Sequence, residues 1–153
     1  DIRQVSEGIG DIVWSINPIH DQMDQLLIRM KRYASDLMDA KNIHYKIEFS
    51  PELNDLKLSM DKRRDLYLYF KEAINNLVKY SKTKVASIDM KTEAGYTQID
   101  VIDHGVGFDV DQIKQGNGLQ NMEQRAGSLG GQFYITSVIG KGTHLQLKIP
   151  IPE

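Results

Sequence analysis

The chain has 153 residues, is 41% hydrophobic and carries a formal net charge of -2 at pH 7. This length can bury one core, so one domain with at most an extra element is expected, and the near-balanced charge does not indicate a general nucleic-acid or membrane surface. The absence of cysteine excludes disulfides, thiolate metal sites and a cysteine nucleophile, and no apolar run approaches the roughly 20 residues of a membrane span.

The first part of the chain is predicted to contain two helices separated by a proline. Residues 1–17 have apolar side chains at helical spacing, and Pro18 ends the pattern. The apolar stripe is wide for a short terminal helix, which favours a partner helix outside this chain over packing on the domain alone. Because the chain begins without Met and within a helical pattern, we interpret it as a piece of a longer protein. Residues 21–42 form a second helical pattern, with Asp21 as its N-terminal signal.

A strand and a long helix are expected next. Residues 43–49 alternate with a period of two, and Pro51 ends this strand. A polar loop then leads to a helix that contains residues 70–81 and is capped by Ser59 or Asp61. The apolar residues at helical spacing, which should form its buried face, are Leu66, Phe70, Ala73, Ile74 and Leu77.

The same helix carries a polar stripe. Glu72, Asn76, Lys79 and Tyr80 follow one another at steps of one to four residues along one side, where they could hold a metal and phosphates. A solvated face is the simpler interpretation, because Glu and Lys are good helix formers. The mid-helix pair of Asn75 and Asn76 weighs against it, because Asn side chains compete for backbone hydrogen bonds. The helix alone leaves both interpretations open.

The remaining chain is predicted to form two hairpins around one helix. The expected segments are strands 85–90 and 96–102 with a turn at 93–95, a glycine-punctuated loop at 105–118, a helix at 119–129, and a hairpin of strands 131–138 and 143–149. This order predicts an α/β fold, a two-layer α/β sandwich in which helices cover one face of a mixed, mostly antiparallel sheet.

Two glycine clusters could contact a nucleotide. Asp103 follows an apolar strand and precedes Gly105 and Gly107, so its carboxylate could accept a hydrogen bond from an exocyclic amine while glycine backbone approaches a planar base. Gly116 and Gly118 lie ahead of a helix, where free N–H groups favour phosphate. Each cluster alone is weak, since turns after strands are often rich in Asp and Gly. Neither fits the phosphate loop or the dinucleotide-binding motif, so those two nucleotide folds are disfavoured.

The order of four motifs is more specific than any one of them. Glu-x-x-x-Asn on a helix is followed by Asp-x-Gly-x-Gly, then Gly-x-Gly-Leu, then Gly-x-Gly-Thr at 140–143. With these motifs the sequence resembles the ATP-binding domain (GHKL, or Bergerat fold) of sensor histidine kinases and gyrase-type ATPases. Within that superfamily it resembles the catalytic domain of bacterial two-component histidine kinases of the nitrate-sensor and lipid-fluidity-sensor group, over nearly the whole chain.

The resemblance implies ATP and Mg²⁺ as cofactors, with the phosphates beside the polar stripe. Asn76 would coordinate Mg²⁺ through an oxygen suited to that hard cation, and Lys79 and Tyr80 would contact phosphate oxygens. Glu72 is the position of the catalytic base in gyrase-type ATPases, whereas in a kinase its carboxylate would help to arrange metal and water.

The resemblance also implies where the base and the lid would lie. Asp103 would accept from the adenine amine, Gly105 and Gly107 would shape the adenine pocket, and Thr143 would lie near the adenine. The expected end of the ATP lid comprises Gly116, Gly118 and Leu119. Two departures from the family pattern stand out: His104 replaces a small polar residue, and the segment 109–115 is short for a lid.

The string HDQMDQLL at 20–27 resembles the phosphoacceptor motif of the same family. We interpret this match as a coincidence, because Pro18 would interrupt the acceptor helix and only one helix separates His20 from the first strand. The acceptor histidine is therefore expected upstream of Asp1. His44 and His144 fall in predicted strands and are interpreted as structural or solvent-facing.

The leading prediction is a histidine kinase catalytic domain at 19–153, preceded at 1–18 by the end of a dimerisation helix and a linker. It would transfer the γ-phosphoryl group of ATP to its own upstream dimerisation domain, for relay to a response regulator. The full-length protein is expected to be a homodimer and a membrane-bound sensor with this domain in the cytoplasm, without nucleic acid as a partner. The alternative is a nucleotide-binding regulatory module or an anti-sigma-type serine kinase of the same superfamily; the helix end before Pro18 favours the sensor kinase.

Overall fold

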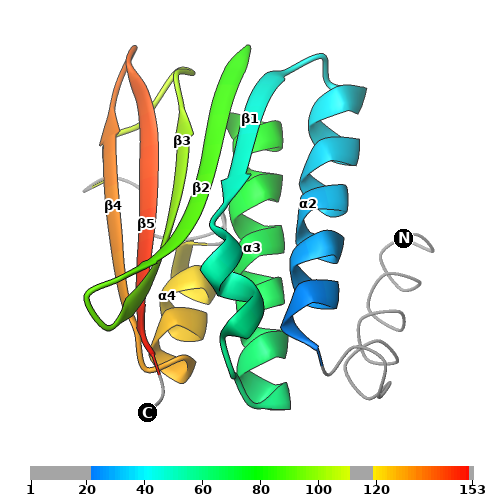
Figure 1. Ribbon diagram of the computed structural model, residues 1–153. Helices are drawn as coiled ribbons and strands as arrows, with labels where there is room; N and C mark the ends of the chain where they lie inside the picture. Colours follow the sequence, from blue (N-terminus) through cyan, green and yellow to red (C-terminus); the bar gives the residue numbers. More distant parts are fainter. Residues whose placement is uncertain (1–21, 111–118, 152–153) are drawn as a thin grey trace, which may run out of the picture.

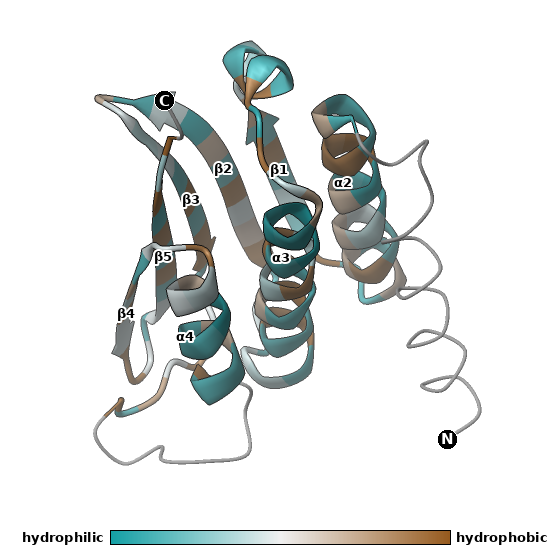
Figure 2. Cartoon of the chain, turned by 90° about the horizontal axis from the view of Figure 1, so that it is seen from below, coloured by the Kyte–Doolittle hydropathy of each residue, from teal (hydrophilic) through white to brown (hydrophobic). Residues whose placement is uncertain are grey.

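The computed structural model describes residues 22–110 and 119–151, which form two layers (Figure 1). In chain order the elements are α2 (Met23–Ala40), β1 (His44–Phe49), the 3₁₀ helix η2 (Pro51–Asp55), α3 (Met60–Tyr80), β2 (Val85–Glu93), β3 (Tyr96–Asp103), α4 (Leu119–Ser128), β4 (Gln132–Val138) and β5 (Gly142–Pro150). The α-helices lie on one face of the sheet, as the view from below shows (Figure 2). The predicted α/β sandwich is confirmed.

The sheet has the strand order β1-β2-β3-β5-β4. Among the described residues, the β1–β2 pair is parallel and the pairs β2–β3, β3–β5 and β4–β5 are antiparallel, so the predicted mixed, mostly antiparallel sheet is also confirmed. The register brings Asp103, the last residue of β3, opposite Thr143 near the start of β5. Two motifs 40 positions apart in the sequence therefore lie side by side.

The core fills the space between the helices and the sheet. Leu66, Phe70, Ala73, Ile74 and Leu77 of α3 are all at most 4% exposed, as their helical spacing predicts. They pack against inward-facing side chains of β2, β3 and β5, where burial alternates along the strands because successive residues face opposite sides of a sheet. The long helix α3 is thereby fixed against the middle of the sheet.

The structure decides or corrects three local predictions, which concern the cap of α3, the segment after Pro51 and the end of β2. Ser59, not Asp61, caps α3, because its Oγ accepts the backbone N–H of Lys62 at 3.2 Å. The polar loop expected after Pro51 instead contains η2, which Pro51 starts and the fully buried Leu53 anchors. β2 continues to Glu93, so the first hairpin turns within Ala94 and Gly95, both with positive φ, as a two-residue turn requires.

Several predictions fall on residues outside the described part. They concern residues 1–18, the signal at Asp21, the acceptor-like His20, most of the lid segment 109–115, and the glycines Gly116 and Gly118. Within residues 22–110 and 119–151, no helix is both long and apolar enough to cross a membrane.

Candidate functional site

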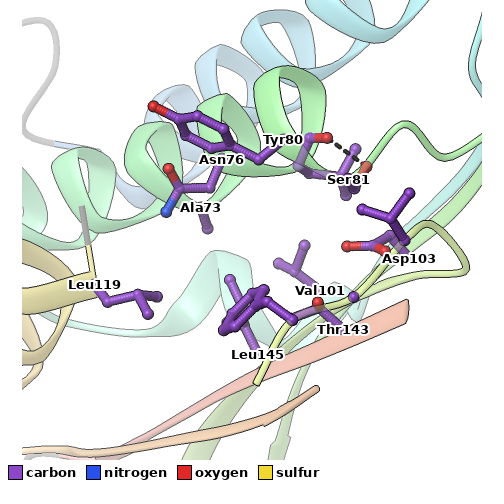
Figure 3. A pocket seen from close by; sticks show the side chains of 13 residues that line it. Ala73, Asn76, Tyr80, Ser81, Val101, Asp103, Leu119, Thr143 and Leu145 are labelled. Atoms are coloured by element: carbon purple, nitrogen blue, oxygen red, sulfur yellow. Dashed lines mark hydrogen bonds between the residues drawn. The ribbon is translucent and has the colours of Figure 1, made fainter. Parts of the chain in front are cut away.

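A cavity of about 190 Å³ lies between the C-terminal half of α3 and the strands β3 and β5. Its walls are formed by Ala73, Asn76, Leu77, Tyr80, Ser81, Val101, Asp103, Val106, Gly107, Phe108, Leu119, Thr143 and Leu145. Figure 3 shows Asn76 and Tyr80 on the helix side, with Asp103, Val101 and Leu145 on the sheet side. A mostly apolar cavity with a few convergent polar groups is typical of a small-molecule site.

The cavity brings together most of the predicted site residues. The six that line it are Asn76, Tyr80, Asp103, Gly107, Leu119 and Thr143. Gly105 lies in the turn beside it, between Asp103 and Gly107. Glu72 and Lys79 lie on α3, half-buried and exposed respectively, and are not among the lining residues. Gly116 and Gly118 are outside the described part of the chain.

Asp103 ends β3 with its carboxylate buried at the cavity. Burial raises the pKa of Asp103 above its ordinary range, outweighing the backbone N–H groups of Gly105 and Thr143, which favour the ionised form. The N–H of Gly105 donates to Oδ1 at 2.9 Å. Among the described residues no side chain donates to this carboxylate, which has about four lone-pair sites, so it retains capacity to accept a hydrogen bond from a ligand.

The glycines after Asp103 are required by close backbone contacts on both sides. A Cβ at Gly105 would lie 2.0 Å from the carbonyl oxygen of Ser81, and the same oxygen accepts the N–H of Val106 at 2.7 Å. A Cβ at Gly107, where φ is +64°, would lie 2.0 Å from the carbonyl oxygen of Val138. The loop therefore packs closely between the end of α3 and the β4–β5 hairpin, and only glycine fits at these two positions. The sequence did not reveal this reason for the glycines.

The two mid-helix asparagines of α3 have different surroundings. Asn75 accepts a hydrogen bond from the Tyr33 hydroxyl of α2 at 2.8 Å, which links the two helices. Asn76 instead lines the cavity. The helix-breaking cost of Asn75 is thus offset by a structural contact, whereas Asn76 offers an amide to a ligand.

The sequence did not identify the apolar walls of the cavity. Val101 and Leu145 are two residues from Asp103 and Thr143 along their strands, so they face the same side of the sheet. The alternation of strand residues could therefore have predicted Val101 and Leu145 as part of the cavity wall. Val106 and Phe108 lie in the loop after β3, where no periodicity applies.

The described residues contain no group of three or more His, Cys, Asp or Glu side chains that could hold a metal ion. A divalent cation at the cavity would therefore take most of its ligands from phosphate and water, as Mg²⁺ commonly does. The amide oxygen of Asn76 is of the type such an ion accepts, so the residues present fit a cation carried in with a nucleotide.

The family model described as histidine kinase-, DNA gyrase B- and HSP90-like ATPase matches residues 61–153. The chain belongs to this family and is an ATP-binding domain of that class. It is 31% identical over 126 residues to the sensor histidine kinase LiaS of Bacillus subtilis (strain 168), covering 81% of this chain and 35% of LiaS. It is also 31% identical over 101 residues to the sensor protein VraS of Staphylococcus aureus (strain COL), covering 65% of this chain and 29% of VraS.

The chain thus spans about a third of the length of these relatives. Among solved structures, the histidine kinase domain of the blue-light activated histidine kinase of Erythrobacter litoralis EL346 matches with a TM-score of 0.71 and 18% identity, over 82% of this chain and 61% of that one. The Acinetobacter baumannii histidine kinase AdeS matches with a TM-score of 0.71 and 14% identity, over 99% of this chain and 81% of that one. They share the fold. The relatives favour the ATPase domain of a sensor histidine kinase, not the alternative of a regulatory module or serine kinase.

Proposed function

We propose that this chain binds Mg-ATP in the cavity between α3 and the sheet, and that residues 19–153 transfer the γ-phosphoryl group to a histidine. That histidine would belong to a dimerisation domain outside this chain, of which residues 1–18 would be the last part, and would pass the phosphoryl group to a response regulator. The full-length protein would be a homodimeric, membrane-bound sensor with this domain in the cytoplasm. The observation that carries the proposal is the buried carboxylate of Asp103 facing an apolar cavity whose opposite wall holds Asn76.

The sheet side of the cavity suits a purine. The carboxylate of Asp103 would accept from the exocyclic amine of adenine, and Val101 and Leu145 offer apolar surface to the ring. Gly107 and Thr143 line the same region, and Gly105 allows the close turn beneath it. A charge-assisted hydrogen bond in an apolar pocket would distinguish adenine from bases that lack the amine.

The helix side suits the phosphates. Tyr80 is 53% exposed at the cavity rim, and the neighbouring Lys79 is exposed, so both long side chains can reach an anion outside the apolar part. Asn76 would hold Mg²⁺, which when bound would neutralise phosphate charge. Gly116, Gly118 and Leu119 would form the end of the ATP lid and take part in nucleotide binding.

Glu72 lies one helical turn before Asn76 on α3 and is half-buried. We infer that its carboxylate orients water or the metal ion and does not act as a hydrolytic base, because a kinase must protect ATP from water. In this proposal the protein supplies positioning and charge neutralisation, which is the main requirement of phosphoryl transfer.

Calorimetric titration with ATP, with and without Mg²⁺, tests the binding site. Asn76→Ala should reduce the gain in affinity that Mg²⁺ provides by roughly tenfold, because the metal ion loses a protein contact. Asn75→Ala is the matched control, because Asn75 contacts Tyr33 of α2 and not the cavity. Equal Mg²⁺ dependence in the wild type and Asn76→Ala would argue against the phosphate assignment.

Labelling with γ-labelled ATP tests the transfer step. The 153-residue chain should bind ATP and label itself poorly, whereas a longer protein that includes the upstream histidine should gain acid-labile label. Label on His20 of the short chain would instead show that the acceptor-like string is a true acceptor.

A further inference from the structure

Thr83 is a buried polar residue outside the cavity, in the short connection between α3 and β2. It is 7% exposed and does not line the cavity. Its Oγ1 accepts the backbone N–H groups of Val85 and His104, each at 3.2 Å, and donates to the carbonyl oxygen of Val85 at 2.6 Å. One hydroxyl thus joins the start of β2 to the residue that directly follows Asp103.

A second hydroxyl extends this link to the end of α3. The Ser81 Oγ donates to the Leu77 carbonyl oxygen at 2.5 Å and accepts the N–H of Thr83 at 3.1 Å. Leu77 and Ser81 belong to the helix wall of the cavity, whereas His104 adjoins Asp103 on the sheet wall. A continuous set of hydrogen bonds therefore connects the helix wall and the sheet wall of the cavity next to Asp103.

We propose that Thr83 is a positioning residue that fixes the direction of the Asp103 carboxylate for recognition of the purine amine. This inference rests on the proposed function, because it assumes that Asp103 binds the adenine ring of ATP.

The backbone explains how Thr83 acts at a distance. The hydroxyl holds the N–H of His104, and the next N–H, that of Gly105, donates to Asp103 Oδ1 at 2.9 Å. The N–H of His104 belongs to the peptide bond that directly follows Asp103, and the N–H of Gly105 belongs to the next peptide bond. Thr83 therefore holds the backbone immediately before the donor that orients the carboxylate. Ser81 supports the same loop from the other side, because its carbonyl oxygen accepts the N–H of Val106 at 2.7 Å. Without the Thr83 hydroxyl, two N–H groups in a part-buried site lose their acceptor, and the loop must move to satisfy them.

The test compares ATP with purine riboside triphosphate, which lacks only the exocyclic amine. Dissociation constants for both nucleotides are measured on the whole chain and on Thr83→Val, Thr83→Ala and Thr83→Ser. The wild type should prefer ATP by about tenfold to a hundredfold, the range for a hydrogen bond to a charged group. The Val and Ala variants should lose at least about threefold of this preference, because the carboxylate is no longer aimed at the amine. Thr83→Ser keeps the hydroxyl and should keep the preference.

A role in stability alone would lower the melting temperature and the affinity for both nucleotides without changing their ratio. An unchanged ratio in Thr83→Val and Thr83→Ala, or loss of the folded state in both, would therefore overturn the inference. A wild-type chain that does not distinguish the two nucleotides would instead contradict the adenine assignment of Asp103, and with it the proposed function. The two failures are thus separate.

Discussion

Asp100 and Asp103 are three residues apart on the same strand, and both are buried, at 9% and 6% exposure. They face opposite sides of the sheet. Asp100 accepts hydrogen bonds from Gln98 and His144 at 2.7 Å and from Gln146 at 2.9 Å. Burial opposes its ionisation, but these hydrogen bonds outweigh burial and lower the pKa of Asp100.

Asp103, on the cavity side, has the opposite balance. Burial raises its pKa, and its protein donors in the described structure are backbone N–H groups alone. A carboxylate whose acceptor sites are filled by neighbouring side chains stabilises the fold, whereas one that is buried with unused sites is prepared for a ligand. Asp100 and Asp103 therefore differ in how fully the protein uses their acceptor sites, which is why we propose a ligand-binding role for Asp103 alone.

The largest expected effect concerns the turn that follows Asp103. Gly105→Ala should lower the free energy of unfolding by at least about 3 kcal/mol, because its Cβ would lie 2.0 Å from the Ser81 carbonyl oxygen. Urea denaturation measures this change. Gly127→Ala is the control, since a Cβ there meets nothing within 4 Å and alanine favours a helix, with an expected gain of about 0.5–1 kcal/mol. Equal stability of the two variants would contradict the described packing of the loop.

Removal of the Asp100 side chain should cause a smaller loss of stability than Gly105→Ala. Asp100→Ala should cost about 2 kcal/mol of unfolding free energy at pH 7, because it removes three hydrogen bonds to a charged acceptor. Since the pKa of Asp100 is lowered in the fold, its stabilisation is present above its ordinary pKa and is lost as the pH falls through the lowered value. The difference from the wild type should therefore shrink in acid.

Asp89→Ala is the control for Asp100, its cross-strand neighbour. The side chain of Asp89 makes no hydrogen bond or ion pair within the described structure, so its removal should change stability by no more than about 0.5 kcal/mol. A comparable loss in both variants would mean that strand composition, not the hydrogen bonds of Asp100, explains the effect.

The neighbouring asparagines of α3 provide an independent comparison. Asn75→Ala should lower the free energy of unfolding by about 1 kcal/mol, because it removes the hydrogen bond from Tyr33. Asn76→Ala should leave it unchanged or slightly higher, because alanine is the better helix former. Thermal denaturation of both variants checks this order. The reverse order would show that Asn76, not Asn75, holds the helix in place.

The smallest effect is a gain from Asp103→Asn. The ionised Asp103 opposes folding at pH 7 because its pKa is raised, and the amide removes this cost. The ligand-free variant should be more stable than the wild type at pH 7 by less than about 1 kcal/mol, since solvent access to the site screens the charge. The gain should disappear as the pH falls and the wild-type carboxyl is protonated. Urea denaturation at several pH values measures it, and a constant difference would contradict a raised pKa.

The sequence predicted the fold well because its signals are periodic. The apolar face of α3 and the alternation in β2 and β3 each repeat many times within one element. The ends of elements depend on single interactions, which explains why the choice between Ser59 and Asp61 stayed open and why η2 was missed.

The order of four motifs predicted the candidate site, whereas each motif alone was a weak signal. The spacing of polar residues put Asn76 on the predicted stripe but gave no role to Asn75, since only the position of Tyr33 on α2 reveals its structural partner. Thr83 gave no signal at all. Its hydrogen bond to the backbone of His104 joins positions 21 apart, which no local pattern encodes. Long-range contacts of this kind require the fold.

The most direct test of the ATP site is a calorimetric titration of Mg-ATP into Asp103→Ala and Asp100→Ala under the same conditions. Both variants remove one buried carboxylate from β3, but from opposite faces of the sheet. We predict that Asp103→Ala binds Mg-ATP at least about tenfold more weakly than the wild type, while the affinity of Asp100→Ala stays within about threefold of the wild type. Equal affinity in the wild type and a folded Asp103→Ala, or a greater loss in Asp100→Ala, would contradict it.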